Sequence, residues 1–187
     1  MTNNKRRIFV LSGPSGCGKN TVYDELKKIN PDIAQTVSAT TRAKRSGETD
    51  GVDYYFIPRE KFDEMVKNGE FVEYVRYGDN FYGTLKCEIE RLTEQNKIVI
   101  LIIEVNGAAN IKKLFPDATS IFILPPSFDE LKKRIMGRGT EQDDDIRKRI
   151  ELAKEELTYQ NAYDYRVVND NLADCVNEVC DIIKGVK

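Results

Sequence analysis

A glycine-rich stretch near the start of the chain has the residue types and spacing of a phosphate-binding loop: Gly13, Pro14, Ser15, Gly16, Cys17, Gly18, Lys19, Asn20 and Thr21. It follows the apolar run 8–11 and precedes an amphipathic segment that begins at Val22, so the order is strand, loop, helix. Glycines let the backbone curl until several N–H groups point inward, and the helix adds its positive end. Lys19 supplies a point charge for the outer phosphates of a nucleotide. The stretch therefore predicts a cradle for a phosphate chain, and its context disfavours an ordinary glycine-rich turn.

One position of this loop departs from the pattern G-x-x-x-x-G-K-[ST]. Asn20 stands where a Ser or Thr hydroxyl normally binds Mg²⁺. An amide oxygen contacts a metal or its water less typically, and Thr21 is one step further along the chain. We therefore assign no metal ligand from the sequence.

The chain has no histidine, which removes the commonest general base and excludes histidine-based acyl transfer. Its chemistry must use carboxylates, cations and positioning. An acceptor that is itself a phosphate is already anionic and needs no general base. Phosphoryl transfer to such an acceptor fits this composition.

Two groups of arginines could clamp a migrating phosphoryl group, because the planar guanidinium binds phosphate oxygens in pairs. The first flanks a polar loop and the second brackets the glycine break at 137–139: Arg42 and Arg45, then Arg134, Arg138, Arg147 and Arg149. A single arginine is more simply a solvated surface residue. The clustering around two loops favours the functional interpretation.

Glu73 lies on a half-exposed strand face and has the chemistry to read guanine. Guanine N1–H and the 2-amino group are both donors, whereas adenine N1 is an acceptor and would be rejected by a carboxylate. Alone, however, Glu73 is one glutamate among many. Tyr54 and Tyr82 could donate to a phosphate, although packing is the simpler role for each.

Composition bounds the class of protein. The 187 residues predict one domain; the chain is 40% hydrophobic and 32% charged, with net charge −2 and a pI near 5.5. No basic field exists to hold nucleic acid, so we expect no polynucleotide partner. The apolar runs are too short to span a membrane, and residues 1–7 lack a signal-peptide core, so we expect a cytoplasmic location.

The four cysteines form no Cys-x-x-Cys pair, which makes a zinc site improbable. Cys17 lies in the cradle beside Lys19 and a helix N-terminus, where thiol pKa values tend to fall. A small space-filling role is favoured for Cys17, with a reactive thiol as the rival hypothesis.

The positioning elements alternate between strands and helices, which predicts an α/β class. Continuous apolar runs are typical of strands buried on both faces of a parallel sheet, and we expect them near 8–11, 33–37, 98–103, 119–124 and 165–168. Between 38 and 96 the pattern predicts a mixed insertion with antiparallel strands. Within it, 70–77 alternates so that Phe71, Glu73 and Val75 share one face.

The chain resembles guanylate kinase, a P-loop nucleoside monophosphate kinase family, from Ile8 to its C-terminal helix. The resemblance rests on the order and spacing of short motifs: LSGPSGCGK at 11–19, SATTRAKRSGE at 38–48, GVDY at 51–54, FVEY at 71–74, FYGT at 81–84, PPS at 125–127, GRGT at 137–140 and VVND at 167–170.

The resemblance implies transfer of the γ-phosphoryl group of ATP, with Mg²⁺, to GMP and dGMP. It implies a P-loop NTPase-type three-layer α/β fold around a five-stranded parallel sheet, in one domain of 1–187. The regions it implies are a core of 1–37, 97–133 and 150–187, a mixed α/β GMP-binding subdomain of 38–96, and a helical lid of 134–149. No oligomeric state follows.

The resemblance also implies roles for individual residues. Residues 13–21, with Arg134 and Asn169, would bind ATP. The residues that would bind GMP lie in or beside the insertion: Ser38, Arg42, Arg45, Tyr54, Glu73, Tyr82, Thr84 and Glu104. Those that would act on the transferring phosphoryl group are Lys19, Arg42, Arg138 and Arg149.

This chain also departs from the family near the strand that ends before Asn106. Asn106 itself replaces a commoner Gln or Glu. The family usually carries an acidic residue at each of positions 102 and 104, and this chain has Ile102 and Glu104.

The rival interpretations of the function are a guanylate-kinase-like module that binds phosphopeptides, and a related kinase with another acceptor. Glu73 and Thr84 favour guanine over other acceptors.

Overall fold

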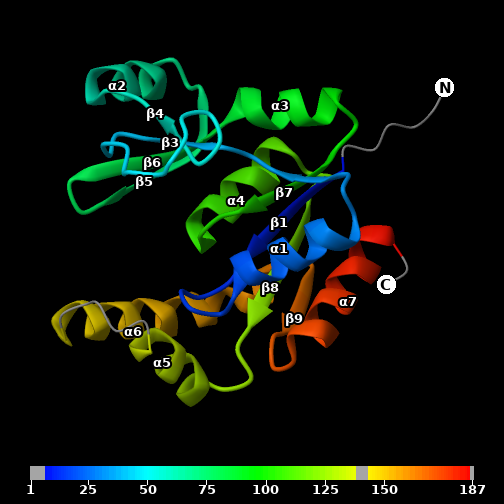
Figure 1. Ribbon diagram of the computed structural model, residues 1–187. Helices are drawn as coiled ribbons and strands as arrows, with labels where there is room; N and C mark the ends of the chain where they lie inside the picture. Colours follow the sequence, from blue (N-terminus) through cyan, green and yellow to red (C-terminus); the bar gives the residue numbers. More distant parts are fainter. Residues whose placement is uncertain (1–6, 138–142, 186–187) are drawn as a thin grey trace.

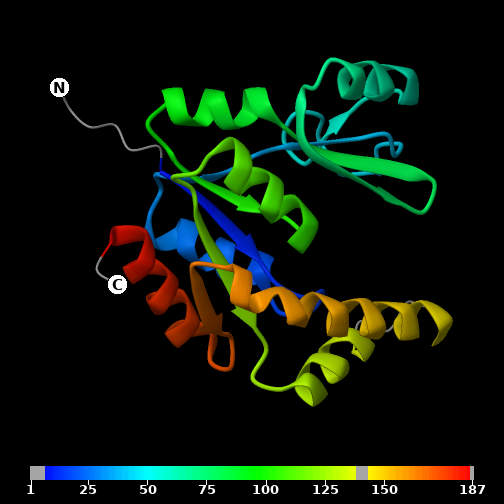
Figure 2. The ribbon, with the colours of Figure 1, turned by 180° about the vertical axis from the view of Figure 1, so that it is seen from behind.

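A five-stranded parallel sheet forms the centre of the protein, as a computed structural model that describes residues 7–137 and 143–185 shows (Figures 1 and 2). The strand order is β2-β7-β1-β8-β9, with every neighbouring pair parallel. The strands are β1 (Ile8–Ser12), β2 (Ile33–Gln35), β7 (Ile98–Ile102), β8 (Thr119–Leu124) and β9 (Tyr165–Val168). The expected parallel α/β sheet is confirmed, and β1 is buried along its whole length.

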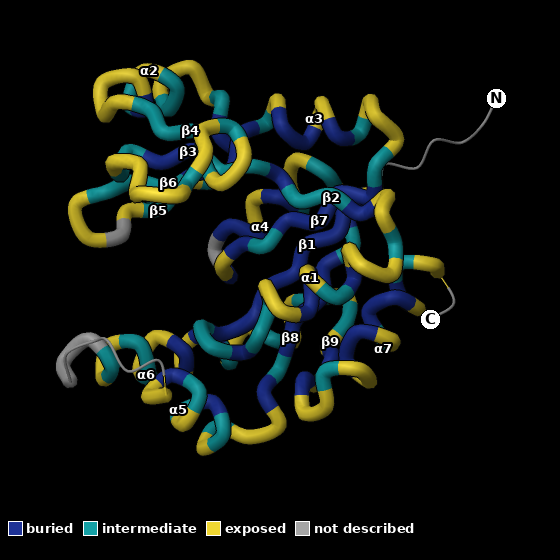
Figure 3. The backbone as a smooth tube through the Cα atoms, in the orientation of Figure 1, coloured by how far each residue is buried: buried dark blue, intermediate teal, exposed yellow. Residues whose placement is uncertain are grey.

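Helices cover both faces of this sheet and complete three layers: α1 (Lys19–Ile29) and α7 (Leu172–Lys184) on one side, α3 (Lys86–Glu94) and α4 (Val105–Leu114) on the other. Alternate residues of β1 therefore enter different cores. Leu11 packs in the cluster that contains Leu26 and Val179. Val10 packs in the cluster that contains Ile89 and Ile111. Figure 3 shows the buried chain concentrated along these strands.

The insertion has a second sheet, of order β4-β3-β6-β5. Its elements are β3 (Ser38–Thr40), β4 (Tyr55–Phe56), α2 (Arg59–Lys67), β5 (Phe71–Tyr77) and β6 (Asn80–Leu85). A separate apolar cluster around the fully buried Phe62 holds it together. Strand β3 was missed by the sequence prediction, because the break between β2 and β3 falls inside one extended-looking run. The prediction of antiparallel strands in the insertion is confirmed, because β6 pairs antiparallel with both β3 and β5.

The predicted alternation of β5 is wrong at its start. The pairing of β5 with β6 shifts register between Phe71 and Glu73. Such a bulge turns successive side chains away from simple alternation. The Phe71 ring consequently lies 4.4 Å from the Phe62 ring, on the α2 side, whereas Glu73 and Val75 line the cavity on the opposite face.

Two further helices project from the core below the insertion in Figure 1: α5 (Phe128–Met136) and α6 (Asp143–Leu157), the latter followed by the 3₁₀ turn η1 (Thr158–Ala162). They share a small core that contains Leu131, Ile135 and Ala153. The predicted lid boundaries remain a prediction, and α6 continues past residue 149. In the described part of the chain, no helix is both long and apolar enough to cross a membrane.

A buried carboxylate ties the insertion to the core. Glu88 of α3 is 2% exposed and accepts hydrogen bonds from the Val37 backbone N–H (3.0 Å) and the Tyr55 hydroxyl (2.9 Å). Arg91 donates to both of its oxygens, at 2.8 and 2.9 Å. Burial would raise the pKa of Glu88, but these hydrogen bonds together lower it below its ordinary value. The chain enters the insertion after Val37 and leaves it through α3, and Glu88 joins these two segments to each other and to Tyr55.

We predict that Glu88→Gln lowers the free energy of unfolding at neutral pH by roughly 1–3 kcal/mol, because buried donors lose a charged acceptor. A lowered pKa gives stability that is present above the unfolded-state pKa and lost as pH falls through the folded-state pKa. The variant should therefore lose less stability in acid than the wild type. Urea unfolding between pH 7 and pH 3 tests this against the exposed control Glu90→Gln; identical curves for the wild type and Glu88→Gln would contradict it.

Candidate nucleotide-binding site

The loop after β1 curls because glycine stands where no side chain fits. Gly13 has φ 141°, and a Cβ there would lie 2.3 Å from the Ile123 carbonyl oxygen of β8. Gly18 has φ 95°, and a Cβ there would lie 2.5 Å from Asn169 Nδ2. The loop is therefore pressed against the ends of β8 and β9, which fixes the path of its backbone.

Lys19 arches back over this loop. Its ammonium group donates to the carbonyl oxygens of Gly13 at 2.6 Å and Pro14 at 3.2 Å. Asn20 and Thr21 follow in the first turn of α1 and are exposed. The cation is thus held at the mouth of the loop, beside the start of a helix.

Asn169 and Arg134 support the loop from its side. Asn169 is 7% exposed, and its side-chain amide donates to the Cys17 carbonyl at 2.9 Å. Arg134 Nη1 donates to the Asn169 carbonyl at 3.2 Å. Neither residue lines the cavity in front of the loop, so the structure places this predicted pair beside the loop and outside that cavity.

Cys17 is fully buried, and burial raises the pKa of its thiol although the Lys19 charge lowers it. The space-filling role therefore has the structural support. Cys87 is exposed on α3.

A cavity of about 660 Å³ lies between the core, the insertion and α6. The predicted site residues that line it come from all three regions: Ser15, Lys19, Ser38, Tyr54, Glu73, Tyr82, Thr84, Glu104 and Arg149. Figure 1 shows the insertion and α6 on opposite sides of this region. Residues separated widely in the sequence are therefore brought to one site.

The set predicted to read guanine forms one polar wall. Thr84 pairs across the sheet with both Ser38 and Glu73, and its hydroxyl donates to Glu73 Oε1 at 2.7 Å. Burial raises the pKa of Glu73, the Thr84 hydrogen bond lowers it, and the charge of Glu104 raises it. The hydrogen bond from Thr84 orients the Glu73 carboxylate and leaves Oε2 available to a ligand in the cavity.

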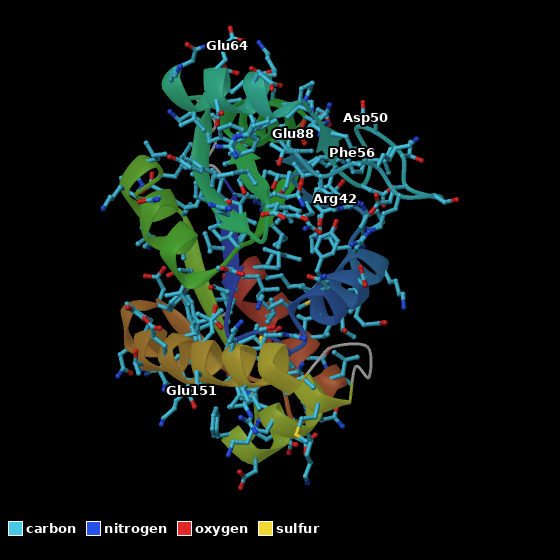
Figure 4. All side chains as sticks on the ribbon, turned by 90° about the vertical axis from the view of Figure 1, so that its left-hand side faces the viewer. Arg42, Asp50, Phe56, Glu64, Glu88 and Glu151 are labelled. Carbon is cyan, nitrogen blue, oxygen red and sulfur yellow. The ribbon has the colours of Figure 1, made fainter. Side chains whose placement is uncertain are left out.

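Arg42 lies beside the cavity and is held by a carboxylate. Glu48 accepts from Arg42 Nη2 at 2.6 Å and Nη1 at 3.0 Å, and from the Arg45 backbone N–H at 2.7 Å. The guanidinium carbon of Arg42 lies 5.6 Å from the centre of the Tyr54 ring. Figure 4 shows Arg42 and Phe56 on the insertion, with Glu151 of α6 across from them. Arg45 is exposed, and neither arginine lines the cavity.

Helix α6 reaches the loop directly. Arg149 Nη2 donates to Ser15 Oγ at 3.0 Å. Arg147 is exposed and lines a separate surface groove. Arg138 lies outside the described residues.

The sequence analysis missed Glu156, which also lines the cavity and is 6% exposed. Its Oε2 accepts from the Ser15 backbone N–H at 3.2 Å. The sequence did carry a signal, because Glu156 follows Arg149 by about two helical turns and so shares its face of α6. Ile102 and Leu152 line the same cavity and give it apolar surface.

A glycine loop at the carboxyl end of the central strand of a parallel sheet, with Lys19 at its mouth, defines a P-loop nucleotide-binding protein. A family model, "Guanylate kinase", matches residues 5–186. A guanylate kinase from Clostridioides difficile is 48% identical over 98% of this chain and 89% of its own length. One from Oceanobacillus iheyensis is 44% identical over 99% and 90%. The solved guanylate kinase of Anaplasma phagocytophilum matches with TM-score 0.74 at 34% identity, over 96% of this chain and 85% of that one. The chain belongs to the guanylate kinase family.

We predict that Cys17 resists alkylation in the folded protein, because its thiol is buried and its pKa is raised. Iodoacetamide labelling followed by peptide mass spectrometry measures each cysteine separately, and the exposed Cys87 is the internal control. Cys17 should be labelled at least about tenfold more slowly than Cys87. Equal rates would restore the reactive-thiol hypothesis.

Proposed function

We propose that this chain transfers the γ-phosphoryl group of ATP to GMP, and also to dGMP, and so forms ADP and GDP or dGDP. Membership of the guanylate kinase family supports the activity. The structural observation that supports this activity is that one cavity is lined both by the loop residues Ser15 and Lys19 and by the polar wall of Glu73 and Thr84. A donor and an acceptor bound to these two walls would meet between them.

The donor phosphates are assigned to the loop. Its backbone amides and the start of α1 offer partial positive charge, and Lys19 adds a full one. Lys19 and Arg149 would stabilise the charge that spreads over the transferring group, since phosphoryl transfer depends mainly on positioning and electrostatic stabilisation. Arg138 is assigned the same role from the family resemblance.

The acceptor phosphate is assigned to the edge of the insertion. Arg42, Arg45, Tyr54 and Tyr82 offer it cations and hydroxyl donors, and Arg42 would exchange its Glu48 partner for the phosphate. The acceptor oxygen is already anionic, so no residue has to remove a proton from it. Approach of the insertion to α6 would exclude water, which competes as an acceptor.

Guanine is assigned to Ser38, Glu73 and Thr84. The Glu73 carboxylate would accept from N1–H and the 2-amino group. The Ser38 hydroxyl would donate to O6, and the Thr84 hydroxyl would do so after turning from Glu73 Oε1. Glu104 lies on the same cavity and adds a second acceptor. Adenine lacks this donor pair and would leave Glu73 unpaired, which costs affinity.

Mg²⁺ is assigned to the donor phosphates. Among the described residues, no group of three or more His, Cys, Asp or Glu side chains gathers to hold a metal. Mg²⁺ keeps several waters and typically uses one or two carboxylates plus substrate phosphates. Glu104 in the cavity and Asn20 at the start of α1 fit that limited role. When bound, the ion neutralises charge on the phosphate chain.

Neither the family match nor the names of the relatives support the phosphopeptide-binding alternative. The cytoplasmic location and the absence of a polynucleotide partner remain predictions.

The direct test measures ADP formation with ATP, Mg²⁺ and each of GMP, dGMP, AMP, CMP and UMP. We expect turnover with GMP and dGMP and at least about 100-fold less with the others, because a buried acceptor is left unpaired. Turnover led by AMP would contradict the guanine assignment. Binding of GMP without turnover would favour a binding module.

We predict that Glu73→Gln weakens GMP affinity about 10- to 100-fold, because it removes a charged acceptor from two donors. The affinity for ATP should stay within about twofold, as should both affinities in the exposed control Glu64→Gln. Calorimetric titration with each nucleotide measures this.

The same assignment predicts a pH dependence. Glu73 must be ionised to accept from guanine, and burial raises its pKa above the ordinary glutamate value. Wild-type GMP affinity should therefore be full above that pKa and fall as pH drops through it. Glu73→Gln should lack this step. Equal losses of GMP and ATP affinity, or an unchanged pH profile, would contradict the role of Glu73.

A further inference from the structure

A carboxylate of α6 occupies one backbone amide of the P-loop. The Ser15 N–H, at the mouth of the cradle, donates to the Glu156 carboxylate at 3.2 Å. Arg149 holds the same residue through its hydroxyl at 3.0 Å. Helix α6 therefore contacts Ser15 at two atoms, once with a cation and once with an anion.

A backbone amide has one hydrogen to donate. A donor phosphate that used the Ser15 N–H would have to replace Glu156, and it would bring more negative charge to a place where a carboxylate already lies. Glu104 and Glu155 add negative charge around Glu156, while the charge of Lys19 opposes it. Burial raises the pKa of Glu156, the Ser15 hydrogen bond and the Lys19 charge lower it, and the charges of Glu104 and Glu155 raise it.

Two buried hydroxyl groups offer the carboxylate a second place. Within the described chain, neither the Tyr163 hydroxyl nor the Ser12 hydroxyl makes a hydrogen bond of ordinary geometry. Burial raises the pKa of Tyr163, the neighbouring Ser12 hydroxyl lowers it, and the charge of Glu156 raises it. Buried donors without partners are costly. A carboxylate that moved from Ser15 could accept from Tyr163, whose oxygen could in turn accept from Ser12.

We propose that Glu156 sets the affinity for the donor nucleotide by competing with a donor phosphate for the Ser15 amide and moving to the Tyr163 hydroxyl when the nucleotide binds. The proposal rests on the proposed function only in assigning the donor to the loop. Its effect is on binding and release of ADP and ATP. Because Glu156 and Arg149 share α6, the exchange also links occupancy of the loop to the position of that helix.

The test measures ADP binding by calorimetry in the whole protein, with Mg²⁺ present. Glu156→Gln removes the charge and keeps the size, and it should tighten ADP binding about three- to tenfold, since like charges at this range are worth on the order of a factor of ten. Glu156→Asp withdraws the carboxylate from Ser15 by one methylene and should also tighten it, by less. Glu151→Gln, on an exposed residue of the same helix, is the matched control and should change nothing.

Tyr163→Phe removes the second position, so it should weaken ADP binding several-fold. In the Glu156→Gln background the same change should have little effect, because the charge that needs the hydroxyl is gone; such a double-mutant cycle isolates the coupling. Thermal unfolding without nucleotide checks that each variant is folded.

Tighter binding together with the coupled Tyr163 effect would support the proposal. Unchanged or weaker ADP binding in both folded Glu156 variants, or Tyr163 effects that simply add, would overturn it. The readout needs no acceptor nucleotide. A failure of GMP turnover would therefore count against the proposed function and leave this test intact.

Discussion

The close packing of one backbone loop against the ends of two neighbouring strands constrains the whole site. Gly13 lies so near the Ile123 carbonyl, and Gly18 so near Asn169, that neither position has room for a Cβ. This contact fixes the path of the loop backbone, where Lys19 emerges and where α1 begins. The parallel sheet supplies the strand ends, and the remaining elements bring other groups to the same point.

Charge balance is the second constraint on the cavity. Glu73, Glu104 and Glu156 line it together, and Glu104 raises the pKa of both Glu73 and Glu156. Carboxylates concentrated around a bound phosphate repel it, and this repulsion weakens binding unless each carboxylate has a hydrogen-bond donor or a cation as its partner. In the proposed function, Glu73 accepts from the polar edge of guanine, and Glu104 lies near guanine and Mg²⁺. Glu156 accepts from the Ser15 amide of the loop, and its proposed effect is on affinity rather than on recognition.

Local periodicity and glycine spacing were enough to predict the parallel sheet and the loop. The family resemblance predicted the set Ser38, Glu73 and Thr84, which the structure brings together. Other features depend on tertiary pairing. The bulge at Phe71 is visible only once β5 meets β6, and β3 is a short strand defined by its neighbours. The clamp of Glu48 on Arg42 was not predicted, because charged residues in a polar loop give no sign of their partner. Glu156 reaches Ser15 across 141 residues of sequence, so only the fold reveals the contact.

A molecule that joins adenosine and guanosine through a single chain of phosphates tests whether donor and acceptor phosphates face each other in one cavity, in competition calorimetry against ADP and GMP. If they do, one such molecule binds per chain and excludes both nucleotides at once, with affinity well above that of either alone. If it excludes only one of them, or if ADP and GMP still bind alongside it, the two nucleotides do not share a cavity.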